Sequence, residues 1–126
     1  MTRTSPVVAI VDDDPSVLKA LSRLLGTWSL GARPFQSGAQ FLASLVDGRP
    51  DCLILDLQMP GMTGLEIQRH LAREGIHIPT IIITAHGDAD MRALCTAAGA
   101  VACLPKPVSS SSLLAAIETA TGRPTG

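Results

Sequence analysis

The 126-residue sequence is poor in aromatic residues and in charge of either sign. It contains no tyrosine, one tryptophan and two phenylalanines, so it lacks the aromatic side chains on which a flavin carrier stacks its cofactor. Charged residues make up 17% of the chain and the net charge is −1. Because nucleic acids and anionic membranes attract strongly basic proteins, this balance gives no support for direct contact with either partner.

Long hydrophobic runs and cysteine clusters are missing as well. No apolar run approaches the roughly 20 residues of a membrane span, and the N-terminal MTRTSP has no signal-peptide core. We therefore expect a cytoplasmic protein. The three cysteines, Cys52, Cys95 and Cys103, are too scattered for a disulfide framework and form no CxxC pair, so we interpret each as a small apolar residue.

What the sequence does contain is typical of one globular unit. Apolar residues make up 46% of the chain, and its length suits one domain with its own core. We expect a single domain over residues 1–126, with a folded core from about residue 5 to residue 122.

Four short apolar runs show no alternation with polar residues. They span Val7 to Val11, Cys52 to Leu55, Thr80 to Thr84 and Val101 to Leu104. Continuous apolar runs of this length are typical of strands in a parallel sheet that is covered on both faces. A fifth strand is predicted near Ala32 to Phe35, and Pro34 places it at a sheet edge because proline has no N–H to donate.

Helical signals fill the segments between these runs. The predicted helices lie near residues 17–25, 38–46, 64–73, 88–97 and 109–122. Ser37 to Gln40 and Thr63 to Glu66 have the capping-box pattern, Asp88 can cap the fourth helix, and Gly122 ends the fifth. The result is five βα units with short connections. Since crossovers between parallel strands are right-handed, the sequence predicts a doubly wound α/β fold.

Polar side chains gather where the predicted strands end, which is where such sheets bind ligands. Asp12, Asp13 and Asp14 follow the first strand, Asp56 ends the third, Thr84 ends the fourth and Lys106 follows the fifth. Clustered carboxylates suit a hard cation such as Mg²⁺, and without the metal a lysine offsets part of their repulsion. Because Asp14 precedes Pro15, we interpret it as a helix cap, which leaves Asp12 and Asp13 for the metal.

Four motifs together resemble the response-regulator receiver domain of two-component signalling. They are VDDD after the first strand, LDLQMPGMTG around Asp56, ITA at the end of the fourth strand and LPKPV after the fifth. They occur in family order and spacing over nearly the whole chain. The resemblance implies a flavodoxin-like (βα)5 sheet with strand order 2-1-3-4-5.

The resemblance also implies a phosphoacceptor site. Asp56 accepts a phosphoryl group from a sensor histidine kinase, Lys106 contacts the phosphoryl oxygens, and Thr84 donates to them once they are in place. Pro107 follows a cis peptide that aims Lys106.

The implied cofactor of this reaction is Mg²⁺. Asp13 and Asp56 bind it directly, Asp12 binds it through water, and the backbone carbonyl of Gln58 supplies a further ligand. The domain assists its own phosphotransfer and dephosphorylation but is not expected to be an enzyme. A phosphatase that uses an aspartyl phosphate needs a second carboxylate two residues after the nucleophile, where this chain has Gln58.

One position departs from the family pattern. Receivers usually carry Phe or Tyr three residues before the lysine, where this chain has Cys103. We therefore expect signalling to depend more on the segment after Thr84, which includes His86, and on the helix at 88–97. The missing ring also leaves open a degenerate receiver that binds proteins without phosphorylation.

The expected output surface consists of the fourth helix, fifth strand and fifth helix. Its predicted apolar members are Met91, Leu94, Val101, Val108 and Leu113. The resemblance implies a phosphorylation-favoured homodimer through this face. The sequence looks most like receivers that precede a helix-turn-helix domain, so we expect control of transcription through a DNA-binding domain outside this chain. Whether the chain is an excised receiver or a stand-alone regulator stays open.

Overall fold

The computed structural model describes residues 6–85 and 89–122. The strands are β1 (Val7–Val11), β2 (Gly31–Phe35), β3 (Cys52–Asp56), β4 (Thr80–Thr84) and β5 (Ala102–Pro105). The helices are α1 (Pro15–Thr27), α2 (Gly38–Ser44), α3 (Gly64–Arg73), α4 (Ala89–Ala97) and α5 (Ser110–Thr121), with a 3₁₀ turn η1 (Leu45–Asp47) after α2.

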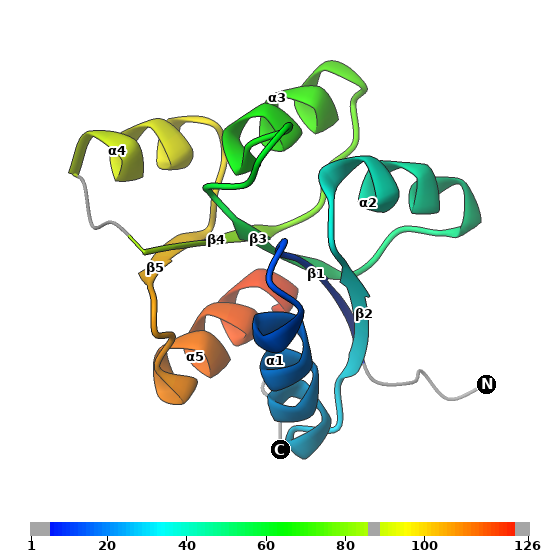
Figure 1. Ribbon diagram of the computed structural model, residues 1–126, viewed down its shortest axis with the longest axis vertical. Coiled ribbons are helices and arrows are strands. Elements are labelled where there is room, and N and C mark those ends of the chain that lie inside the picture. The colour runs from blue at the N-terminus through cyan, green and yellow to red at the C-terminus, as the bar shows by residue number, and fades with distance from the viewer. Residues whose placement is uncertain (1–5, 86–88, 123–126) are drawn as a thin grey trace.

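The five strands form one parallel sheet in the order β2-β1-β3-β4-β5. Helices α1 and α5 cover one face of the sheet, and α2, α3 and α4 cover the other (Figure 1). The predicted doubly wound α/β fold, its strand order and its five helices are therefore confirmed.

The three central strands supply both halves of the core. In β1, Val8 and Ile10 pack among residues of α1 and α5, whereas Ala9 and Val11 pack toward α2 and α3. Every residue of β3 and β4 is buried. Because side chains alternate between two covered faces, a central strand needs apolar residues at successive positions, which explains the uninterrupted runs.

The edge strands differ from the central ones. Pro34 lies in β2, which pairs only with β1 in the described sheet, as its missing N–H predicted. Strand β5 forms the other edge and begins at Ala102, one residue later than predicted. Val101 precedes it and is 39% exposed, so the apolar run there is half-buried and not covered on both faces.

Side chains define the helix starts largely as the motifs predicted. The Asp14 carboxylate accepts from the Ser16 N–H, and Pro15 is the first residue of α1. Thr63 and Glu66 bond reciprocally in a complete capping box.

The start of α2 corrects one prediction. Ser37 caps the helix, but the Gln40 carboxamide oxygen accepts from the N–H of Gln36 and not from that of Ser37. The motif therefore forms half a capping box, because the Gln40 side chain reaches one residue further back. The helix also ends at Ser44, since the Gly48 N–H bonds to the Leu45 carbonyl and tightens the last turn into η1.

Three predictions fall on residues whose placement is not described. These are the Asp88 cap, His86 and the side chain of Met91. Among the described residues, no helix is long and apolar enough to cross a lipid bilayer.

Candidate functional site

The polar residues predicted at the strand ends meet at one edge of the sheet. Asp12 directly follows β1, Asp56 ends β3 and Thr84 ends β4. The Lys106 N–H donates to the Thr84 carbonyl at 2.8 Å, which extends the pairing of β4 and β5 and places the lysine beside the acidic residues. The parallel topology brings these groups together because all five strands point their carboxyl ends the same way.

Three carboxylates form a compact acidic cluster. One oxygen from each of Asp12, Asp13 and Asp56 lies within 4.8 Å of the others. Asp12 is completely buried and Asp56 is 3% exposed, whereas Asp13 is exposed. The cluster therefore has two members inside the protein and one facing solvent, which gives a ligand an open side from which to enter.

Lys106 partly neutralises the two buried members. Its Nζ atom lies 3.0 Å from Asp12 Oδ2 and 3.4 Å from Asp56 Oδ2. Burial by itself lowers the pKa of Lys106, but the hydrogen bond to Asp12 and the charges of both carboxylates outweigh it and raise that pKa overall. The ammonium thus stays charged and offsets the repulsion that the VDDD sequence creates.

The pKa of Asp56 is raised, first because the carboxyl is buried and second because Asp12 lies beside it. The charge of Lys106 and the Gln58 N–H, which donates to Asp56 Oδ1 at 3.3 Å, act in the opposite direction. Asp56 is therefore a carboxylate whose negative charge is less favourable than that of a solvated aspartate. A bound cation or a transferred phosphoryl group relieves this repulsion.

Asp14 does not belong to the cluster. It is exposed, and its carboxylate accepts from both the N–H and the hydroxyl of Ser16 at 2.9 and 2.7 Å. These bonds lower the pKa of Asp14. The interpretation of Asp14 as a helix cap is confirmed, and Asp12 and Asp13 lie together in the acidic cluster, where their role as metal ligands stays a prediction.

Gly64 allows α3 to approach the end of β3 closely. A Cβ atom at this position would lie 2.6 Å from the Asp56 carbonyl oxygen and 3.0 Å from Leu57 Cα. The Gly64 N–H donates to the Leu57 carbonyl, which ties the helix start to the strand end. Gly61 has a positive φ of 85° and turns the connecting loop. The close approach at Gly64 depends on tertiary packing, because the atoms that a Cβ would meet belong to another element of the fold.

The donor set fits Mg²⁺. Asp12, Asp13 and Asp56 offer only carboxylate oxygens, which are the ligands that this hard cation prefers. Asp12 Oδ2 is buried and is held in an ion pair with Lys106 Nζ at 3.0 Å. Buried carboxylates of this kind depend on a nearby cation, and one ammonium shared by Asp12 and Asp56 leaves room for a second, divalent one on the open side of the cluster.

The neighbouring polar residues lie where the motifs placed them. Thr84 is 2% exposed and follows Ile83, whose carbonyl accepts from the Leu57 N–H. Gln58 is exposed two residues after Asp56. The Lys106–Pro107 peptide is cis, as the resemblance implied.

The three thiols behave as small apolar groups. Burial raises the pKa of Cys52 to about 12 and raises the pKa values of Cys95 and Cys103. The thiolate, which is the reactive form, is therefore disfavoured. Cys103 is half-buried and packs against the apolar cluster that contains Cys95, at the position where the family resemblance implied an aromatic ring.

The predicted output face needs one correction. Leu113 is fully buried between α5 and the sheet, so it belongs to the core. Val108 also packs partly against that core. Leu94 on α4 and Val101 before β5 remain, with exposed fractions of 45% and 39%. An apolar residue near the start of a helix can face either way, and here the helix turns Leu113 inward.

This fold and its acidic cluster define an α/β domain with a polar site at the carboxyl ends of its strands, and comparison with known proteins places it in a family. A model of the response regulator receiver domain matches residues 8–118. The response regulator protein TmoT of Ectopseudomonas mendocina is 43% identical over 120 residues, which cover 95% of this chain and 54% of TmoT. The transcriptional regulatory protein FixJ of Rhizobium meliloti (strain 1021) is 40% identical over 117 residues, covering 93% of this chain and 57% of FixJ.

Solved structures agree with these matches. The crystal structure of FixJ-N superposes with a TM-score of 0.86 at 38% identity, covering 97% of this chain and 96% of the other. A response regulator receiver protein from Burkholderia phymatum gives a TM-score of 0.86 at 44% identity, covering 96% and 98%.

The chain belongs to the response regulator receiver domain family. It is thus a regulatory domain of two-component systems, and the degenerate, phosphorylation-independent module finds no support in these matches. The chain spans about half the length of the curated relatives it matches.

Proposed function

We propose that Asp56 is the phosphoacceptor of this receiver and that a sensor histidine kinase is its phosphodonor. The observation that carries the proposal is the placement of the Asp56 carboxylate, buried at the sheet edge beside Asp12 and within 3.4 Å of Lys106 Nζ. This arrangement supplies a nucleophile, a fixed positive charge and the oxygen ligands of a metal at one point.

In the proposed transfer, an Asp56 carboxylate oxygen attacks the phosphorus of a phosphohistidine. A phosphorus–oxygen bond forms while the phosphorus–nitrogen bond breaks, and the electron pair of that bond stays on the histidine nitrogen. Lys106 compensates charge on the phosphoryl oxygens, and its bonds to Asp12 and Thr84 hold it in position. Mg²⁺, held by Asp12, Asp13, Asp56 and the carbonyl of Gln58, would supply further positive charge.

The kinase must approach from the open side of the acidic cluster. A largely apolar groove of about 530 Å³ lies between α1 and the segment that follows β5, and Lys106 forms part of its wall. Its other lining residues are Val17, Ala20, Leu21, Leu24, Pro107 and Val108. We propose this groove as the surface on which the protein phosphodonor docks, because a protein seated there lies beside the acceptor.

The output that we propose is control of transcription. FixJ and TdiR are named transcriptional regulatory proteins, and this chain covers about half of each. Phosphorylation would draw the Thr84 hydroxyl toward the new phosphoryl group and thereby shift the connection to α4. The exposed Leu94 and Val101 support the predicted phosphorylation-favoured homodimer through α4, β5 and α5.

The test is intact mass after treatment with phosphoramidate, a small phosphodonor, in the presence of Mg²⁺. We expect a single phosphoryl adduct that disappears when EDTA removes the metal, because three carboxylates otherwise repel the incoming anion. Failure to form any adduct with Mg²⁺ would contradict the proposal.

Replacing Lys106 by Met should lower stability when Mg²⁺ is absent. The substitution leaves Asp12 and Asp56 buried without their cation. Removing one partner of a buried ion pair costs about 3–5 kcal/mol of unfolding free energy, and we expect the lower end of that range because the Lys106 side chain is 24% exposed. Mg²⁺ should restore most of this loss, because it occupies the same carboxylates. The measurement is urea unfolding with and without Mg²⁺. Lys19→Met, which removes an exposed lysine on α1, is the matched control, and equal effects of the two substitutions would argue against the role of Lys106.

A further inference from the structure

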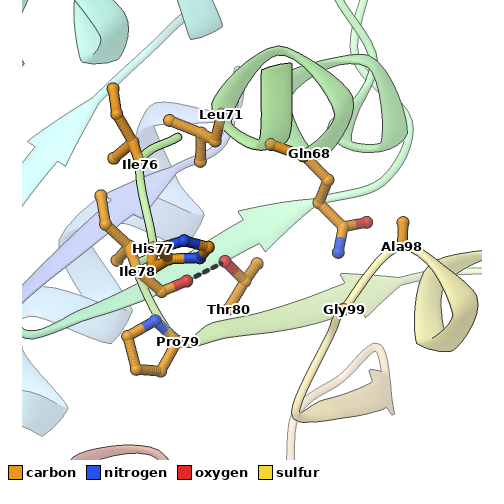
Figure 2. A pocket seen from close by; sticks show the side chains of 10 residues that line it. Gln68, Leu71, Ile76, His77, Ile78, Pro79, Thr80, Ala98 and Gly99 are labelled. Atoms are coloured by element: carbon orange, nitrogen blue, oxygen red, sulfur yellow. Dashed lines mark hydrogen bonds between the residues drawn. The ribbon is translucent and has the colours of Figure 1, made fainter. Parts of the chain in front are cut away.

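A second groove lies at the opposite end of the sheet from Asp56. It has a volume of about 390 Å³ and opens between α3, the segment that leads into β4 and the turn after α4 (Figure 2). Thr80 begins β4 and Thr84 ends it, so about 13 Å of strand separates this groove from the acidic edge. The groove is therefore a separate feature of the molecule, within the size range of small-molecule sites, about 300–1,000 Å³.

Gln68 on α3 is the unusual residue of the groove. Its side chain extends from the helix toward Ala98 and Thr80 (Figure 2), and the residue is only 4% exposed. Its Nε2 donates to the Cys95 carbonyl at 3.4 Å, and this bond assigns the orientation of the amide. The other amide atom, Oε1, is buried and has no hydrogen-bond partner. A buried acceptor without a donor is unfavourable, so the site is incomplete as it stands.

Little holds the Gln68 amide in this orientation. The 3.4 Å bond is long for an N–H donor, and the Cys95 carbonyl already accepts from the Ala100 N–H at 3.0 Å. Turning the amide toward the groove would therefore break one weak bond and leave the Cys95 carbonyl paired, while Nε2 would exchange that bond for solvent in the groove. We infer that this turned amide, with Oε1 facing the groove, is the form that accepts a hydrogen bond from a bound molecule.

The rest of the lining defines the chemistry of that molecule. Leu71, Ala72, Ile76, Ile78 and Pro79 present apolar surface. The Thr80 hydroxyl is engaged with the Ile78 carbonyl at 2.9 Å. The lining residues that the structure describes include the His77 imidazole but no Asp, Glu, Lys or Arg, so no permanently charged side chain there would compensate a phosphate or carboxylate ligand.

We propose that this groove binds a compact, mostly apolar small molecule that carries one hydrogen-bond donor, with Gln68 Oε1 as the acceptor. The apolar body lies against Leu71, Ile76 and Ile78, and the donor meets the amide that α3 extends toward α4. Gln68 contacts Cys95 in the last turn of α4, and Ala98 and Gly99 directly after that helix line the groove. A molecule bound in the groove would therefore contact the C-terminal end of α4. This proposal is independent of the phosphorylation chemistry.

The test compares two probes that differ in one donor, indole and 1-methylindole. Each is titrated into the ¹⁵N-labelled protein, and shifts are followed for backbone amides and the Gln68 side-chain NH₂. We expect indole to bind with a dissociation constant on the order of 1 mM, as a small fragment would, with the largest shifts at Gln68, Thr80, Ala98 and Gly99. Methylation of the indole nitrogen should weaken binding about fivefold, because it removes the donor.

Two variants and a control distinguish binding at this groove from non-specific binding of an apolar probe. Gln68→Met keeps the side-chain length and should abolish the preference for indole over 1-methylindole. Ala72→Leu fills the groove from its exposed rim and should weaken both probes, whereas Ala115→Leu on the exposed side of α5 should change neither. Asp56→Asn should bind indole as wild type does. Equal affinity of the two probes, or shifts confined to the groove beside Lys106, would overturn the proposal, as would the absence of any shift.

Discussion

Asp56→Asn is expected to abolish the phosphoryl adduct completely. The substitution removes the nucleophilic carboxylate oxygen and replaces it by an amide of almost the same shape, so the space at the end of β3 stays filled. The oxygen of the new amide can still accept from the Gln58 N–H, as the Asp56 carboxylate does at 3.3 Å. The loss therefore reports on chemistry and not on folding. Intact mass after phosphoramidate and Mg²⁺ treatment measures it.

The stability of the same variant provides an internal control. Without Mg²⁺, Asp56→Asn removes a buried negative charge that repels Asp12, while Lys106 keeps its 3.0 Å contact with Asp12. We expect a melting temperature equal to or above that of wild type. Added Mg²⁺ should raise the melting temperature of wild type more than that of the variant, because the variant has lost one metal ligand.

A different outcome would change the assignment of the site. If Asp56→Asn still formed the adduct, the phosphoryl group would be attached to another residue. Asp13 would be the first candidate, because it is the exposed carboxylate of the same acidic cluster. Peptide mapping of borohydride-reduced protein would locate it. If Asp56→Asn lost both the adduct and the fold, the missing adduct would say nothing about the phosphoacceptor. The melting curve would then decide, because an unfolded variant contradicts the expectation that removing the buried charge of Asp56 preserves stability.

Gly64→Ala is expected to lower the free energy of unfolding by about 2–3 kcal/mol. The added methyl would lie 2.6 Å from the Asp56 carbonyl oxygen and 3.0 Å from Leu57 Cα, and both are backbone atoms that cannot rotate away. Either α3 or the end of β3 must move, and overpacking of this kind typically costs about 1–3 kcal/mol. Because the same backbone carries Asp56, the proposed phosphoacceptor, phosphorylation should slow as well.

Gly26→Ala is the matched control for this prediction. Gly26 lies in the last turn of α1, and a Cβ atom there meets nothing within 4 Å. Alanine has the higher helix propensity, so we expect this variant to gain about 0.5 kcal/mol and to phosphorylate normally. Urea unfolding of the two variants should give opposite signs. A neutral effect of Gly64→Ala would mean that α3 is less tightly seated on Asp56 than the structure indicates.

Cys103 separates this receiver from the usual family pattern. Its half-buried sulfur packs against the cluster that includes Cys95, so this position has no aromatic ring that could respond to the proposed movement of Thr84. The expectation that signalling depends on the segment after Thr84 and on α4 stays a prediction. Gln68 on α3 donates to the Cys95 carbonyl and so gives α4 a polar contact with α3.

Much of the architecture was predictable from local patterns. Uninterrupted apolar runs indicated strands covered on both faces, because a central strand of a parallel sheet meets helices on each side. Pro34 indicated an edge strand, Asp14 before Pro15 indicated a helix start, and Thr63 to Glu66 formed the expected capping box. The strand ends also indicated which polar residues would meet, since parallel strands finish at one edge.

What each side chain does at that edge, and which apolar residues face outward, was decided by the tertiary structure. Strand order followed from family resemblance and not from local pattern, because right-handed crossovers are compatible with more than one order. The bridge from Lys106 to two aspartates, the close approach at Gly64 and the inward turn of Leu113 all join residues distant in the chain. The unpaired oxygen of Gln68 also depends on the tertiary structure. A glutamine on a helix becomes buried only where another element packs against it, and the local sequence does not indicate that packing.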